Sequence, residues 1–108
     1  DSPPADVHVD VTLPASCWII EGKMVQKETL AGVVCRLGSR EIDVRFDRPL
    51  PPLTNVKLRL SYPGLGHDSG DLYGKCLGEV PDGGRPLSRI RLTSVDTLDQ
   101  KILEGFLG

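Results

Sequence analysis

Two arginines four residues apart, Arg36 and Arg40, are the residues of this sequence whose chemistry most clearly suggests ligand binding. A guanidinium group binds phosphate through paired, charge-assisted hydrogen bonds, so two such groups near each other could hold the phosphates of a nucleotide. These two arginines are therefore the best candidates in the chain for binding an anionic ligand.

Further cations recur at alternate positions of later segments: Arg45, Arg48, Lys57, Arg59, Arg89 and Arg91. If adjacent strands aligned them, one face would be basic and could attract an anion. Glu41, Asp43 and Asp47 lie among them, so the pattern predicts a mixed-charge outer face. On that face Asp43 and Asp47 would point outward and serve solubility.

The three cysteines form no recognisable motif. Cys17, Cys35 and Cys76 are odd in number and widely spaced, which indicates neither a disulfide framework nor a CxxC metal knuckle. We interpret them as small buried apolar residues in a reducing compartment.

No pattern of an enzyme or of a cofactor site is present. His67 lies in a Gly-rich turn beside Asp68 and Asp71, where a solvated loop is a simpler interpretation than a weak metal or acid site. The chain has no GxSxG motif, and residues 64–70 lack the Lys-Ser/Thr and the following helix of a phosphate loop. The sequence therefore predicts a binding or regulatory domain without catalysis, metal or cofactor.

Length and charge narrow the class of protein further. The 108 residues fit one domain, and the net charge of −2 argues against a general nucleic-acid binder. No apolar run approaches the ~20 residues of a membrane helix, so no membrane insertion is expected. The sequence starts at Asp1 without a basic and apolar leader, and we expect a piece cut from a longer protein.

Strand patterns begin early in the chain. Residues 1–6 are expected to form a flexible lead-in, and residues 7–13 alternate between apolar and polar, which predicts a half-buried strand. A break is expected over residues 14–16, followed by a second strand over residues 17–20. Residues 23–29 are compatible with a polar edge strand or with a short helical turn.

A hairpin and a connector occupy the middle of the chain. Residues 33–37 and 42–46 predict two paired strands around Gly38. Residues 49–53 contain three prolines, which cannot donate to a sheet, and indicate a rigid connector. Residues 56–60 show the clearest alternation of apolar and charged side chains.

The second half predicts two more strands. A long turn is expected over residues 63–70, followed by a strand over residues 72–80. Gly74 and Gly78 indicate bulges or close backbone approach in a curved sheet. The last strand spans residues 89–93.

The tail changes to helical periodicity. Its apolar residues recur three and four positions apart: Val95, Leu98, Ile102, Leu103, Phe106 and Leu107. Thr97 with Gln100 fits a capping box, and Asp96 is an alternative cap. A helix this short is unstable alone, so it must pack on the sheet.

These elements predict an all-β fold with small α content, built as a curved sheet or barrel. Closure would remove the sheet edges, and glycines would permit the bending. Trp18 and Tyr73 could form a stacking platform, but filling of the core is the simpler interpretation.

From about residue 30 to residue 107, the order of features resembles a PilZ domain. The segments that carry the resemblance are residues 30–34, 42–44, 49–52, 56–60, 72–75, 89–92 and 102–107. The resemblance implies a six-stranded Greek-key β-barrel over residues 7–108, with a C-terminal helix packed on one end. It also implies a bacterial, cytoplasmic signalling domain, and the typical ligand of the family is cyclic di-GMP.

The ligand motifs of that family are not matched. The family binds cyclic di-GMP with an RxxxR motif on an N-terminal arm. The first arginine of this sequence is Arg36, so that motif is missing here. The positions expected for the Asp, Ser and Gly of a [D/N]xSxxG element hold Cys35, Leu37 and Arg40. None of the three suits that role.

The sequence thus predicts a degenerate PilZ-like regulatory domain that acts through a protein partner or an adjacent domain of a larger chain. The N-terminal strand over residues 7–13 or the helix over residues 97–107 would be the contact surface. The alternative is a cyclic di-GMP receptor that binds through Arg36 and Arg40.

Overall fold

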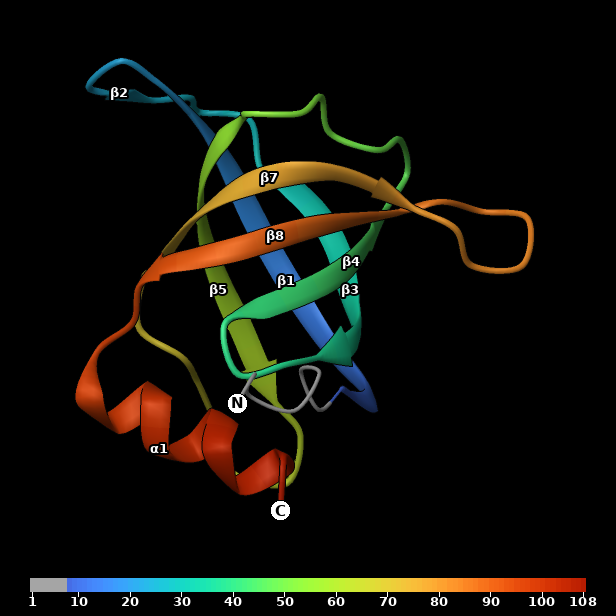
Figure 1. Ribbon diagram of the computed structural model, residues 1–108. Helices are drawn as coiled ribbons and strands as arrows, with labels where there is room; N and C mark the ends of the chain where they lie inside the picture. The colour runs from blue at the N-terminus through green and yellow to red at the C-terminus, as the bar shows by residue number, and fades with distance from the viewer. Residues whose placement is uncertain (1–7) are drawn as a thin grey trace, which may run out of the picture.

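The computed structural model describes residues 8–108, and within this range it contains eight strands and one helix (Figure 1). The elements are β1 (Val9–Glu21), β2 (Met24–Val25), β3 (Leu30–Leu37), β4 (Glu41–Phe46), β5 (Asn55–Tyr62), β6 (His67–Asp68), β7 (Leu72–Val80), β8 (Leu87–Ser94) and α1 (Thr97–Phe106). The predicted lead-in over residues 1–6 lies outside the described residues, as does Val7.

Six strands form a closed antiparallel barrel. They pair in the order β1-β3-β4-β8-β7-β5, and a pairing between β1 and β5 closes the ring. Because β4 lies beside β8, the connection from β4 to β5 must cross one end of the barrel, which is the Greek-key arrangement. Figure 1 shows this proline-rich connector at one end and α1 at the other. The expected mostly β fold, a six-stranded barrel with a C-terminal helix, is confirmed.

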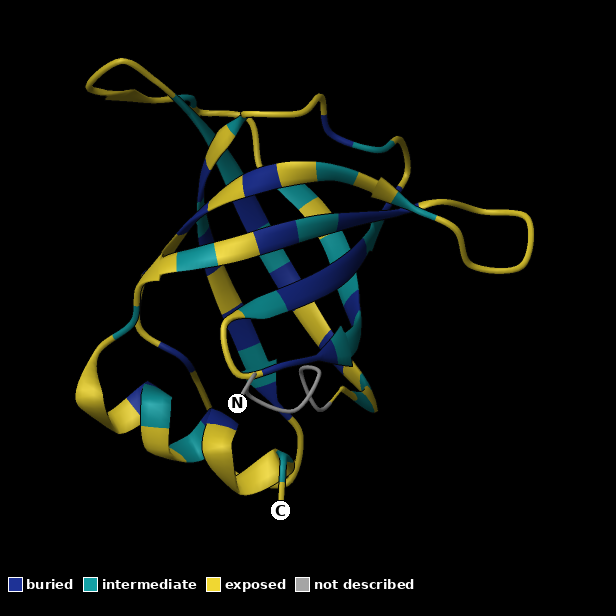
Figure 2. Cartoon of the chain, in the orientation of Figure 1, coloured by how far each residue is buried: buried dark blue, intermediate teal, exposed yellow. Residues whose placement is uncertain are grey.

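The core fills the barrel from alternate strand positions. On β5, Val56, Leu58 and Leu60 are fully buried, whereas Lys57 and Arg59 between them face outward. Figure 2 shows the same alternation as bands of dark blue and yellow along the strands. Each fully buried aliphatic side chain contributes roughly 1.5–3 kcal/mol by leaving water, so this alternation fixes which face of every strand is inside.

The expected break over residues 14–16 is wrong, because β1 is continuous. Pro14 pairs with Val33 of β3 on one side, whereas pairing with β5 starts only at Ala15. Proline is tolerated in a strand where no neighbour needs its missing N–H. The two strands expected in this region are one long strand that has β3 and β5 as partners.

Short strands extend two of the long ones. Residues 23–29, for which two interpretations were open, contain the edge strand β2, paired with the end of β1. The expected turn over residues 63–70 contains β6, which pairs with the end of β5. The predicted hairpin around Gly38 is present, with the Gly38 amide donating to the Glu41 carbonyl at 2.8 Å.

Gly74 and Gly78 lie at irregularities in the pairing of β7 with β8, as predicted. A Cβ on Gly74 would come within 2.6 Å of Ile90 Cγ2 and 2.7 Å of the Arg91 carbonyl oxygen, so only glycine fits. Gly78 has a φ of 136°, a conformation that other residues rarely adopt. The two glycines let β7 bend around the barrel.

The helix begins at an aspartate cap. Asp96 accepts a hydrogen bond of 2.8 Å from the Asp99 amide through Oδ1, so Asp96, and not Thr97, is the N-cap. The side chain of Asp99 is itself buried and accepts hydrogen bonds from the Tyr62 hydroxyl (2.7 Å) and the Gly70 amide (3.0 Å). These bonds fix the first turn of α1 against the end of β5 and the loop after β6.

The inner face of α1 matches the predicted apolar stripe in part: Leu103 is buried, and Val95, Ile102 and Leu107 pack against the core as expected. Asp99 and Leu103, one turn apart, are buried against the barrel, whereas Leu98 is 65% exposed and Phe106 is 36% exposed. Because Asp99 is held by hydrogen bonds, its neighbour Leu98 is rotated about 100° toward solvent. Apolar periodicity alone could not reveal that a carboxylate faces the barrel.

Candidate functional site

Arg36 lies on β3 directly opposite Asp43 of β4, on the outer surface of the barrel. Its Nε is 3.0 Å from Asp43 Oδ2, and its Nη2 donates a 3.5 Å hydrogen bond to the Pro81 carbonyl. The first of the two candidate phosphate-binding arginines is therefore engaged within the protein.

A second arginine completes this arrangement around Asp43. Arg89 of β8 donates from Nε to Oδ1 at 2.8 Å and from Nη2 to Oδ2 at 3.0 Å. The Asp43 side chain is only 2% exposed as a result. The prediction that Asp43 is a solubilising residue is wrong. It does lie on the outer face, but two guanidinium groups cover it, whereas Asp47 is exposed as predicted.

Arg40 lies elsewhere, in the turn between β3 and β4. Its carbonyl accepts a 2.8 Å hydrogen bond from the Leu92 amide, and its exposed side chain lines a surface hollow with the end of β8 and with α1. Arg36 does not line that hollow. The two candidate arginines therefore differ in their surroundings: Arg36 is paired with Asp43, whereas Arg40 lines the hollow.

The remaining positions of the family motif offer no ligand donors. Leu37 is fully buried in the core. Cys35 is half-buried at an irregularity of the β3–β4 pairing, and its Sγ donates to the Val33 carbonyl at 3.5 Å. The strand that would carry the Asp and Ser of the motif thus presents a thiol and an aliphatic side chain.

Other arginines of the outer face are also paired. Arg45 Nη2 lies 3.0 Å from Asp82 Oδ2, and Arg59 Nε lies 2.7 Å from Asp71 Oδ1. The hydrogen bond from Arg59 holds the pKa of Asp71 below its ordinary value and, reciprocally, raises the pKa of Arg59. The predicted mixed-charge face is confirmed, because acidic partners neutralise these cations.

Trp18 and Tyr73 are not in the core, so the preferred interpretation of these aromatics is wrong. Trp18 of β1 is half-buried and pairs with Lys57 of β5, which in turn pairs with Tyr73 of β7, 37% exposed. Lys57 Nζ is 4.8 Å from the centre of the Trp18 ring, and the guanidinium carbon of Arg59 is 5.9 Å from it. Tyr73 shares its strand parity with Lys75 and Trp18 shares its parity with Ser16, a signal of outward orientation that the sequence already contained.

Comparison with solved structures identifies the fold. The inhibitor of motility MotI/DgrA from Bacillus subtilis superposes with a TM-score of 0.72 at 12% identity over 99% of this chain, which spans half of MotI. The PilZ domain of CeSA from a cellulose-synthesizing bacterium superposes with a TM-score of 0.55 at 18% identity, covering 89% of this chain and 88% of that domain. The chain has the fold of a PilZ domain. No protein-family model and no curated protein sequence matches it.

All three cysteines of this PilZ-like domain are free thiols. Cys17 and Cys76 are fully buried, and burial raises the pKa of both thiols, that of Cys17 to about 12. His67 contacts the Tyr62 ring edge-on, at 5.7 Å between centroids, and Asp71 binds Arg59. Across residues 8–108 no three His, Cys, Asp or Glu side chains come together as metal ligands.

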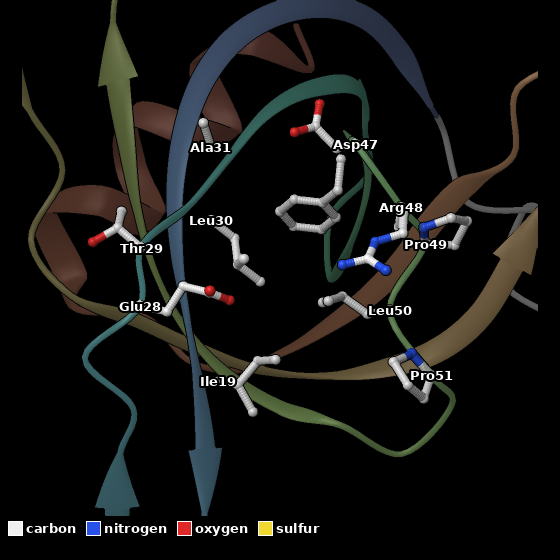
Figure 3. A pocket seen from close by; sticks show the side chains of 11 residues that line it. Ile19, Glu28, Thr29, Leu30, Ala31, Asp47, Arg48, Pro49, Leu50 and Pro51 are labelled. Atoms are coloured by element: carbon white, nitrogen blue, oxygen red, sulfur yellow. The ribbon is translucent and has the colours of Figure 1, made fainter.

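A groove of about 650 Å³ lies at the connector end of the PilZ-like barrel (Figure 3). Its apolar lining includes Ile19 and Leu50, and Figure 3 shows Arg48 extending over it toward the side that carries Glu28. Because Glu28 and Asp47 both line the groove with this single arginine, its charge does not favour an anionic ligand.

None of the helical segments in residues 8–108 combines the length and the apolar character needed to cross a bilayer.

Proposed function

We propose that this PilZ-like domain is a bacterial, cytoplasmic regulatory module that acts by contact with a protein, without catalysis and without cyclic di-GMP binding of its own. The observation that carries the proposal is the ion pair between Arg36 and Asp43. A nucleotide could recruit Arg36 only by removing it from a carboxylate that is 2% exposed. Removing one partner of a fully buried ion pair costs about 3–5 kcal/mol, because the remaining charge is left uncompensated. The cost of removing Arg36 is smaller than this, because Arg89 still binds the Asp43 carboxylate.

The outer face of β1, β5 and β7 supports a protein contact. Trp18, Lys57 and Tyr73 form a row across three adjacent strands, and Arg59 lies beside the tryptophan. Tryptophan, tyrosine and arginine are the residues most enriched at the centres of protein interfaces. The two cations favour a partner surface that carries carboxylates between apolar groups.

The expected contact surfaces, residues 7–13 and 97–107, have weaker support. Leu13 is buried in the core, and α1 exposes only separate apolar side chains, Leu98 and Phe106. The name of one structural neighbour, an inhibitor of motility, describes regulation and not catalysis, which agrees with the proposal.

Calorimetric titration with cyclic di-GMP tests the proposal against its alternative, a receptor that uses Arg36 and Arg40. We expect no saturable heat at micromolar ligand. Saturating heat that the Arg36→Ala variant abolishes would overturn the proposal in favour of a cyclic di-GMP receptor.

A co-purification experiment tests the contact surface. We expect the Trp18→Ala/Tyr73→Ala double variant to lose a bacterial protein that the unmodified domain retains. Met24→Ala is the matched control, because Met24 is a 73% exposed apolar residue on the β1–β2 hairpin, outside the aromatic row. Retention of every bound protein by the double variant would contradict this surface.

A further inference from the structure

A hollow of about 460 Å³ lies at the α1 end of the barrel, between the β3–β4 turn, the end of β8 and α1. In Figure 1 these three segments lie at the same end of the molecule. The lining residues are Ser39, Arg40, Arg91, Leu92, Thr93, Ser94, Val95 and Gln100. Its size falls in the range of small-molecule sites.

The lining contains several side-chain hydrogen-bond donors that have no partner among residues 8–108. Arg40 and Arg91 are both exposed, and neither side chain has an ion pair or a hydrogen bond among residues 8–108. This distinguishes them from Arg36, Arg45, Arg59 and Arg89, which all bind carboxylates. Three hydroxyl groups, from Ser39, Thr93 and Ser94, line the same hollow, and their side chains likewise have no partner in the described range.

The carboxylates of Glu41 and Glu104 form no ion pair with these two arginines. Glu41 pairs with Arg91 across β4 and β8, but no ion pair within 4.0 Å joins their side chains. Glu104 of α1 accepts a 3.1 Å hydrogen bond from Gln100 Nε2 and makes no ion pair with Arg40. Lys75 lies on the other side of Arg91, across the β7–β8 pairing, and adds to the positive potential.

The geometry points to a binding site for a small phosphate monoester in this hollow. Arg40 and Arg91 bind the phosphate, and the hydroxyls of Ser39, Thr93 and Ser94 donate to its remaining oxygens. Two guanidinium groups match the charge of a phosphate dianion. Leu92 and Val95, half-buried and apolar, lie in the same lining and contact the organic part of the ester.

This site shares no residue with the row of Trp18, Lys57 and Tyr73. Phosphate binding and the proposed protein contact can therefore succeed or fail separately. The site also omits Arg36, so it differs from the alternative in which Arg36 and Arg40 bind one nucleotide.

Titration of the chain with phenyl phosphate, followed by ¹H–¹⁵N NMR, tests the site. We expect saturable shifts centred on the amides of Leu92, Ser94 and Val95, weaker binding of inorganic phosphate, and none of phenol. Binding should weaken as the pH falls below about 6, where the phosphate takes up its second proton.

Variants locate the anion. Arg40→Gln and Arg91→Gln should each weaken phenyl phosphate binding about tenfold, because each removes a charge-assisted pair of hydrogen bonds. Arg85→Gln is the matched control, because Arg85 is an exposed arginine in the β7–β8 loop, outside the hollow. The Arg85→Gln variant should bind phenyl phosphate as tightly as the unmodified chain does. Equal binding by an Arg40→Gln/Arg91→Gln double variant, or no saturable binding by the unmodified chain, would overturn the proposal.

Discussion

Arg89 binds the carboxylate of Asp43 with two hydrogen bonds, Nε to Oδ1 at 2.8 Å and Nη2 to Oδ2 at 3.0 Å. The two residues face each other across β4 and β8, and Arg36 contacts the same carboxylate from β3. Three neighbouring strands are thus joined on their outer face by one buried charge. The same contact that stabilises the barrel occupies the arginine that sequence reasoning assigned to a ligand.

Replacement of Asp43 by Asn should destabilise the domain by about 2 kcal/mol, because hydrogen bonds to a charged group contribute about 1.5–3 kcal/mol and two guanidinium groups lose their counter-charge. The loss is expected to stay below that of a fully buried pair, since the side chains of Arg36 and Arg89 remain about 30% exposed. Urea denaturation of the two proteins measures the difference in free energy of unfolding.

Asp82→Asn is the control for that experiment. Asp82 also pairs with an arginine, Arg45, at 3.0 Å, but its side chain is 41% exposed. An exposed pair contributes about 0–1 kcal/mol. If Asp43→Asn costs no more than Asp82→Asn, the structural role assigned to Asp43 is incorrect.

Tyr62→Phe should weaken the attachment of α1 to the barrel. Loss of the Tyr62 hydroxyl leaves the buried Asp99 with one donor fewer, which costs about 1–3 kcal/mol at neutral pH. Thermal denaturation followed by circular dichroism measures the loss. Tyr73→Phe is the matched control, since the Tyr73 hydroxyl has no hydrogen bond among residues 8–108.

The same substitution should change how stability depends on alkaline pH. Burial, together with the hydrogen bond to Asp99, raises the pKa of Tyr62 in the folded state above its ordinary value of 10.0. Above pH 10 the unfolded tyrosine ionises while the folded one stays neutral, so the native protein loses about 1.4 kcal/mol per pH unit until the folded pKa is reached. The difference in stability between native protein and Tyr62→Phe should therefore narrow from pH 10 to pH 11. A constant difference over this range would contradict the raised pKa.

The barrel was predictable from sequence because its causes are local. Alternation over residues 56–60 fixes which side chains are inside, prolines over residues 49–53 exclude a strand, and Gly74 and Gly78 mark the bends. Pro14 misled the prediction because a proline interrupts a strand only where a neighbour requires its N–H, and pairing partners cannot be read from one segment.

The candidate site was less predictable, because it depends on which side chains meet across strands. The outward parity of Asp43 was correct, but only the register that aligns Arg36, Asp43 and Arg89 shows that the carboxylate is covered. The hollow at Arg40 likewise needs Arg91, which lies 51 positions later in the chain. The apolar periodicity of one strand cannot predict which side chains of different strands lie next to each other.

Substitution of two glycines by alanine should have opposite effects. Gly74→Ala should destabilise the domain by about 2 kcal/mol, because the new Cβ would lie 2.6 Å from Ile90 Cγ2 and 2.7 Å from a backbone carbonyl. Gly105→Ala should stabilise it by about 1 kcal/mol, since Gly105 is helical and no atom lies within 4 Å of the added Cβ. The melting temperatures should shift in opposite directions by about 5 °C per kcal/mol. A Gly105→Ala variant less stable than the native protein would mean that α1 is not formed as described.

Alkylation should separate the three cysteines. Cys17 and Cys76 are fully buried, and their raised pKa values keep both thiols protonated at pH 8, so neither the access nor the thiolate that iodoacetamide needs is available. Cys35 is half-buried on the outer side of β3 and should be the single site modified in the native domain. Mass spectrometry should then show one adduct without urea and three adducts above the unfolding transition. Modification of Cys17 in the native domain at the rate of Cys35 would show that the barrel opens far more readily than its closed hydrogen-bonded ring permits.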